Sequence, residues 1–81
     1  MKKKNIVSEI LGWYGVAAIL TAYILLNLGF ISTQNIFYQI LNITGALCIA
    51  YDSLKDKDYQ PAVLNIIWAI IAFIAIIKIL I

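Results

Sequence analysis

The positions of the charged residues divide the chain into long uncharged segments. After Glu9 the next charged residue is Asp52, so residues 10–51 form an uncharged, largely apolar stretch of 42 residues. A continuous helix rises about 1.5 Å per residue, so this stretch would reach about 63 Å, roughly twice the thickness of a bilayer's hydrocarbon core. The pattern therefore predicts two membrane-spanning helices joined by a turn.

A cluster of small and polar residues near the middle of this stretch predicts the turn. Gly29 suits the position that follows a helix end, and Ser32 or Thr33 suits the N-cap of the next helix. We therefore expect the first span to cover residues 9–28 and the second to cover residues 33–51.

A third apolar segment follows a polar loop, predicted over residues 52–60, in which acidic and basic residues alternate. Pro61 opens this segment at a position where a helix does not need the missing N–H group. The third span runs over residues 61–81, and its single charge, Lys78, lies near enough to the end to reach the headgroups. Lipid cannot satisfy bare backbone groups, so each span must be helical. The predicted fold is a single all-α domain over residues 1–81, an integral membrane three-helix bundle.

Composition points to the same environment. Hydrophobic residues make up 64% of the chain and charged residues 12%, and the mean hydropathy is +0.98. Soluble domains average about 45–50% apolar and about 25% charged residues, and disordered chains are less hydrophobic still. The net charge of +2 is too small to suggest binding to nucleic acid. We therefore expect the chain to lie in a lipid bilayer.

The lysines predict the orientation of the chain. Lys2, Lys3, Lys4, Lys55 and Lys57 all fall on one side of the membrane in a three-span arrangement. The positive-inside rule then places the N-terminus in the cytoplasm. A cleaved signal peptide is the alternative for the first apolar run, but this run is long and no small-x-small site follows it.

Few residues could support catalysis. The chain has no histidine, and its serines have no buried lysine beside them to act as a base. No cluster of metal-ligating residues is present, and the single cysteine, Cys48, excludes a disulfide within the chain. Glu9 fits an acid favoured by the dipole at a helix N-terminus better than it fits a proton site. We expect no enzyme activity, no metal and no cofactor.

Small and amide residues recur at helical spacing and predict which face of each span contacts protein. In one interpretation they only pack helices together, because Gly and Ala allow close approach and buried amides bond across an interface for about 0.6–2 kcal/mol each. In the other, Gln39, Asn42 and Asn65 line a polar cavity, where amides donate to and accept from a neutral, hydroxyl-rich solute. The residues predicted to pack helices are Gly12, Gly15, Ala18, Ala22, Gly45, Ala46, Ala69 and Ala72.

Three motifs resemble those of a known family. Residues 11–15 read LGWYG, residues 38–46 read YQILNITGA, and residues 61–68 read PAVLNIIW. Together they resemble a family of small, uncharacterised bacterial inner-membrane proteins, over residues 10 to about 78. The resemblance implies a membrane protein and no particular activity.

A more distant resemblance is to the SemiSWEET and PQ-loop group of transporters. Thr21–Leu25 precedes Leu26 and Asn27, where that group has a Pro-Gln pair, and Asn65 follows Pro61 shortly after the polar loop. The resemblance implies a three-helix half-transporter that pairs as a homodimer and passes a small solute between its protomers, with Asn65 contacting the solute. Leu26 stands in place of the group's hinge proline.

Two functions are therefore open. The first is a homodimeric half-transporter for a small neutral solute that binds near Asn42 and Asn65 between two protomers. The second is a structural or accessory membrane protein whose buried amides only hold helices together. A water-accessible cavity lined by Gln39, Asn42 and Asn65 is expected for the first function, and dry, bonded amides are expected for the second.

Overall fold

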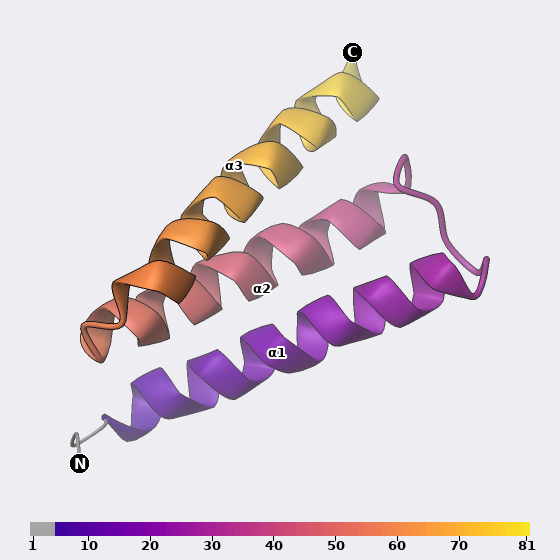
Figure 1. The fold of residues 1–81 in the computed structure, drawn as a ribbon. Coiled ribbons are helices and arrows are strands. Elements are labelled where there is room, and N and C mark those ends of the chain that lie inside the picture. Colours follow the sequence, from indigo (N-terminus) through magenta and orange to yellow (C-terminus); the bar gives the residue numbers. More distant parts are fainter. Residues whose placement is uncertain (1–4) are drawn as a thin grey trace.

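Three α-helices make up the computed structural model, which describes residues 5–81. They are α1 (Ile6–Asn27), α2 (Ile36–Lys55) and α3 (Tyr59–Leu80), as Figure 1 shows. The prediction of an all-α fold is confirmed. Lys2, Lys3 and Lys4, on which the predicted orientation partly depends, lie outside the described residues.

The second helix is the centre of the arrangement. Helices α1 and α3 each pack against α2, and no Cα atom of α1 lies within 8 Å of a Cα atom of α3. The chain direction alternates, so the α2–α3 loop lies at the end where α1 begins, and the α1–α2 loop lies at the end where α3 finishes (Figure 1). α1 stays beside α2, whereas α3 diverges from α2 toward its own C-terminal end. The result is an elongated molecule, 43 × 23 × 18 Å.

The turn after α1 uses Gly29 as the sequence predicts. Gly29 has a φ of +84°, a left-handed conformation that glycine adopts without strain. Its N–H donates to the carbonyl of Leu26 at 3.2 Å, and the N–H of Phe30 donates to that of Leu25 at 3.0 Å. These two bonds form a Schellman motif, which satisfies carbonyls that the helix end leaves free.

The prediction that Ser32 or Thr33 caps α2 is wrong, because Asn35 is the N-cap. The side chain of Asn35 accepts a hydrogen bond from the N–H of Phe37 at 2.8 Å. The preceding residues form a turn instead, in which the N–H of Asn35 donates to the carbonyl of Ser32 at 3.1 Å. The second helix therefore covers Ile36–Lys55 in place of the expected 33–51.

The loop between α2 and α3 is also shorter than the predicted range of 52–60. Asp52 belongs to the last part of α2, and only residues 56–58 separate the two helices. Lys57 takes a left-handed conformation with a φ of +56° and closes a second Schellman motif. Pro61 is the third residue of α3, not the first. It is tolerated there because the first four N–H groups of a helix have no partner within it.

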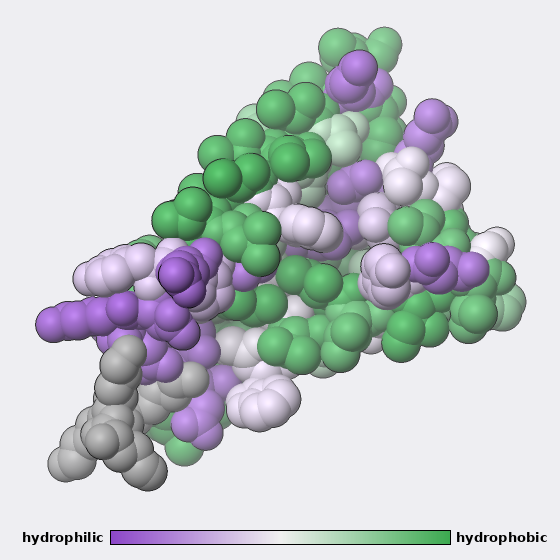
Figure 2. Space-filling model, in the orientation of Figure 1, coloured by the Kyte–Doolittle hydropathy of each residue, from purple (hydrophilic) through white to green (hydrophobic). Residues whose placement is uncertain are grey.

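The buried side chains are all small or polar, and the large apolar ones lie outside. Trp13, Phe37 and Ile67 are each more than half exposed. Figure 2 shows apolar side chains over the sides of the helices and hydrophilic ones gathered mainly at the ends. A water-soluble fold buries its large apolar residues, so this distribution is the inverse of a soluble core. The buried residues are Ser8, Gly12, Gly15, Ala18, Ala22, Gln39, Asn42, Gly45, Ala46, Ala50, Ser53, Ala62, Asn65, Ala69 and Ala72.

Two of the helices, α1 and α3, are long and apolar enough to cross a membrane. α2 is 20 residues long but contains amide, hydroxyl and charged side chains, and it does not meet the same standard. The described residues thus supply two candidate membrane spans, where the sequence pattern predicts three.

Candidate functional site

The contact between α1 and α2 depends on two facing glycines. A Cβ atom added to Gly15 would lie 2.5 Å from the carbonyl oxygen of Gly45, and one added to Gly45 would lie 3.0 Å from the carbonyl oxygen of Gly15. The two backbones are therefore in direct contact at this point. Each residue that the sequence analysis assigned to helix packing is buried, on all three helices.

A polar contact closes one end of this interface. The hydroxyl of Ser8, which is 0% exposed, donates to Oδ1 of Asp52 at 2.7 Å. Gly12 leaves the space for the carboxylate, because a Cβ at this position would overlap it. Asp52 thus anchors the C-terminal part of α2 against α1. This contact was not predicted from the sequence, where Asp52 was expected in a polar loop. The spacing of Ser8 and Gly12 on one helical face was the available signal.

Further side-chain bonds join the helices nearer the middle of the molecule. The hydroxyl groups of Tyr14 on α1 and Thr44 on α2 lie 3.1 Å apart. The indole N–H of Trp68 on α3 donates to Oδ1 of Asn42 on α2 at 3.3 Å. Each pair of adjacent helices therefore has at least one hydrogen bond across it, in addition to close packing of small residues.

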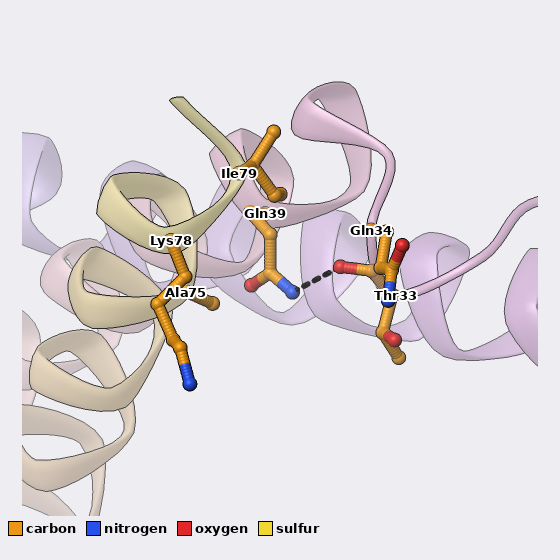
Figure 3. Close-up of a pocket in the computed structure, with 6 residues that line it drawn as sticks. All are labelled: Thr33, Gln34, Gln39, Ala75, Lys78 and Ile79. Carbon is orange, nitrogen blue, oxygen red and sulfur yellow. Dashed lines mark hydrogen bonds between the residues drawn. The ribbon is translucent and has the colours of Figure 1, made fainter. Parts of the chain in front are cut away.

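A crevice opens between α2 and α3 where the two helices diverge, and we call it the α2–α3 crevice. Its wide part has a volume of about 480 Å³, and its narrow part about 190 Å³. Both parts are lined by Thr33, Gln39 and Ala75, so they adjoin each other. The wide part is also lined by Gln34, Lys78 and Ile79 (Figure 3), and the narrow part by Tyr38, Asn42, Trp68, Ile71 and Ala72.

The structure brings two of the three predicted solute-binding amides into this crevice. Gln39 (7% exposed) donates from Nε2 to the carbonyl of Thr33 at 2.7 Å, as Figure 3 shows. Asn42 (5% exposed) accepts the bond from Trp68. Asn65 (9% exposed) donates to the carbonyl of Pro61, one turn earlier on α3, at 2.8 Å, and is not among the residues that line the crevice.

The crevice amides keep unused hydrogen-bonding capacity. Within the described residues, Oε1 of Gln39 and Nδ2 of Asn42 make no hydrogen bond. Among residues 5–81, every side-chain nitrogen or oxygen atom that is fully buried has a hydrogen-bond partner. Both free atoms are therefore accessible from outside the protein, one as an acceptor and one as a donor.

Two residues of the α2–α3 crevice, Trp68 and Lys78, were not predicted from the sequence to belong to it. Trp68 was expected only as part of a family motif, yet its indole N–H holds Asn42 in place. Lys78 was expected to extend to the headgroups, and it lines the wide part of the crevice. The position of Lys78 as a single charge within an apolar helix could have marked it as a candidate site residue. The pairing of Trp68 with Asn42 could not be predicted, because it depends on the register between two helices.

The structure defines the protein as a three-helix chain with small-residue interfaces and two apolar helices able to cross a membrane. A family model matches residues 8–81, so the chain belongs to that family, which is uncharacterised. This agrees with the resemblance to an uncharacterised family, and the match provides no link to the SemiSWEET or PQ-loop group. No curated protein and no solved structure matches the chain.

Proposed function

We propose that the chain is an integral membrane protein that crosses the bilayer three times. The observation that carries this proposal is the placement of large apolar side chains on the outside and small or amide residues inside. Helices α1 and α3 have 22 residues each. At about 1.5 Å per residue such a helix reaches about 33 Å, enough for a hydrocarbon core of about 30 Å.

The less apolar α2 can cross as well, because it lies between the other two helices. Its amide and hydroxyl groups bond to backbone carbonyls or to the flanking helices, as Gln39, Asn42 and Thr44 show. In this arrangement Lys55 and Lys57 lie at the end where α1 begins, and Lys78 lies at the opposite end. The positive-inside rule favours the end with more lysines as the cytoplasmic one.

Labelling of single cysteines tests the number of crossings. In a Cys48→Ser background, S32C places a thiol in the α1–α2 loop and D58C places one in the α2–α3 loop. A membrane-impermeant maleimide should label S32C only from outside the cell and D58C only in inverted vesicles. Labelling of both variants from the same side would contradict a crossing by α2, and a protein that stays in solution without detergent would contradict membrane insertion altogether.

We propose as its activity a homodimeric half-transporter that passes a small neutral solute along the α2–α3 crevice. The support is the free acceptor of Gln39 and the free donor of Asn42 in an open space of suitable size for a small molecule. A second copy related by a twofold axis would cover the narrow part of the crevice with the same amides and leave the wide part open. Asn65, the third amide of the sequence prediction, does not line the crevice, and its Nδ2 donates to the carbonyl of Pro61 on its own helix.

Solute uptake into proteoliposomes, measured over a panel of labelled neutral solutes, tests the transporter. Asn42→Leu removes an amide from the crevice, and Asn65→Leu removes one outside it and serves as the matched control. If the protein is a transporter, the wild type should take up at least one solute, Asn42→Leu should abolish this uptake, and Asn65→Leu should leave it unchanged. Equal loss in both variants, or no uptake of any solute, would contradict it.

A structural or accessory role is the second candidate, and a specific observation favours it. Gln39, Asn42 and Asn65 each already have a hydrogen bond within the chain. If the amides serve only to hold the helices together, Asn42→Leu should lower the free energy of unfolding of the detergent-solubilised protein by about 0.6–2 kcal/mol, as expected for one buried hydrogen bond. The wild type would then show no solute uptake.

A further inference from the structure

Lys78 stands apart from every acidic residue of the chain. The acids are Glu9, Asp52, Asp56 and Asp58, and all four belong to the end of the molecule where α1 begins. Lys78 lies at the other end, in the last turn of α3, and makes no ion pair within the described residues. Its positive charge is therefore available to a ligand.

The surroundings of Lys78 suit an anion with an apolar extension. Thr33 and Gln34 supply a hydroxyl and an amide to the wide part of the crevice, and Ala75 and Ile79 supply apolar walls. α2 begins at Ile36, directly after this polar segment, so the positive end of its helix dipole lies beside the same space. Gln39 enters this space from α2, with its amide bonded to Thr33, and Lys78 enters it from α3 (Figure 3).

We propose that the wide part of the crevice binds the phosphate group of an anionic phospholipid. This inference rests on the proposed membrane location and does not depend on transport. With α3 across the bilayer, Lys78 lies near the level of the headgroups, and the open side of the crevice lets the acyl chains extend into the surrounding lipid. The narrow part, with Asn42, stays outside the lipid site.

The charge distribution favours an anionic lipid over a zwitterionic one. The choline group of phosphatidylcholine carries a positive charge next to its phosphate, and no acidic side chain lies at this end of the molecule to accept it. Phosphatidylglycerol presents the same phosphate without that charge. We therefore expect selectivity for phosphatidylglycerol, supplied mainly by Lys78.

Native mass spectrometry of the full chain, released from detergent micelles with defined lipids, tests this site. The variant is Lys78→Gln, and the matched control is Lys57→Gln, which removes the same charge from the opposite end. We expect retained phosphatidylglycerol to fall about fivefold in Lys78→Gln, the equivalent of about 1 kcal/mol for one lysine near a lipid phosphate, and to stay unchanged in Lys57→Gln. Lys78→Arg should retain the lipid.

Other outcomes would overturn the proposal. Equal retention of phosphatidylglycerol by the wild type and Lys78→Gln, with matching helical circular dichroism, would show that Lys78 does not bind it. Equal retention of phosphatidylcholine would remove the selectivity, and displacement of the lipid by water-soluble glycerol 3-phosphate would indicate a site for free phosphate. A protein that needs detergent yet shows no lipid preference contradicts only this inference, whereas one soluble without detergent contradicts the membrane location.

Discussion

The contact of Gly15 with Gly45 makes a quantitative prediction about the pairing of α1 and α2. A side chain at position 15 would begin with a Cβ atom 2.5 Å from the carbonyl oxygen of Gly45 and 2.6 Å from Cγ1 of Ile49. The carbonyl belongs to the helix backbone and cannot rotate away, so α1 and α2 would have to separate by close to an ångström. Separation would also lengthen the neighbouring contacts between small residues along the same interface.

Gly15→Leu should therefore destabilise the protein strongly. Forcing extra carbons into a packed interface costs typically about 1–3 kcal/mol, and the obstruction here is backbone, so we expect a loss of about 3 kcal/mol or more. The higher helix propensity of leucine offsets less than about 1 kcal/mol of this. In a membrane the loss matters more, because helices there associate through packing and not through the hydrophobic effect.

Thermal unfolding in detergent micelles, followed by far-ultraviolet circular dichroism, measures this loss. Ala17→Leu is the matched control, because it adds a similar side chain to an exposed position two residues along α1. We expect a large drop in Tm for Gly15→Leu and a change within the noise for Ala17→Leu. Equal Tm values for the two variants would refute the close approach of α1 and α2.

The polar contacts and helix ends yield three further predictions, each read from the same unfolding experiment. Ser8→Ala removes the bond to Asp52 and should cost about 1–2 kcal/mol; an unchanged Tm would mean that the carboxylate does not rely on this hydroxyl. Lys57 has a left-handed backbone conformation that glycine adopts without strain, so Lys57→Gly should stabilise the protein by about 1 kcal/mol and raise its Tm. A lower Tm would contradict the left-handed conformation at residue 57. Asn35→Ala removes the N-cap of α2 and should lower the free energy of unfolding by about 1 kcal/mol, whereas Ser32→Ala should leave it unchanged. A larger loss for Ser32→Ala than for Asn35→Ala would indicate that Ser32 is the N-cap, as the sequence predicted.

The sequence predicted the helices well and their ends less well. Long uncharged stretches allow only helices in lipid, which is why three helices could be expected without any structure. The start of α2 was misplaced because Ser32, Thr33 and Asn35 are all good N-caps, and the choice among them depends on the path of the turn. The end of α2 was misplaced because Asp52 and its neighbours remain helical when one of them is anchored to an adjacent helix.

The candidate site was predicted in its residue types and missed in its geometry. Helical periodicity identified Gln39, Asn42 and Asn65 as inward-facing, and all three are buried. Periodicity gives the direction of a side chain around its own helix, but it does not give the angle between two helices. Because α3 diverges from α2, Gln39 and Asn42 line an open crevice, and Asn65, nearer the start of α3, does not. The role of Lys78 in the crevice depends on the same divergence.

The lack of contact between α1 and α3 has a mechanical consequence. Both outer helices pack only against α2, and α3 diverges from α2 toward its C-terminal end. A change in the tilt of that half of α3 would leave the contact of Gly15 with Gly45, on the other side of α2, unchanged. The tilt of this half of α3, and with it the width of the α2–α3 crevice, therefore depends on what packs against the outer face of α3 as well as on its contacts with α2.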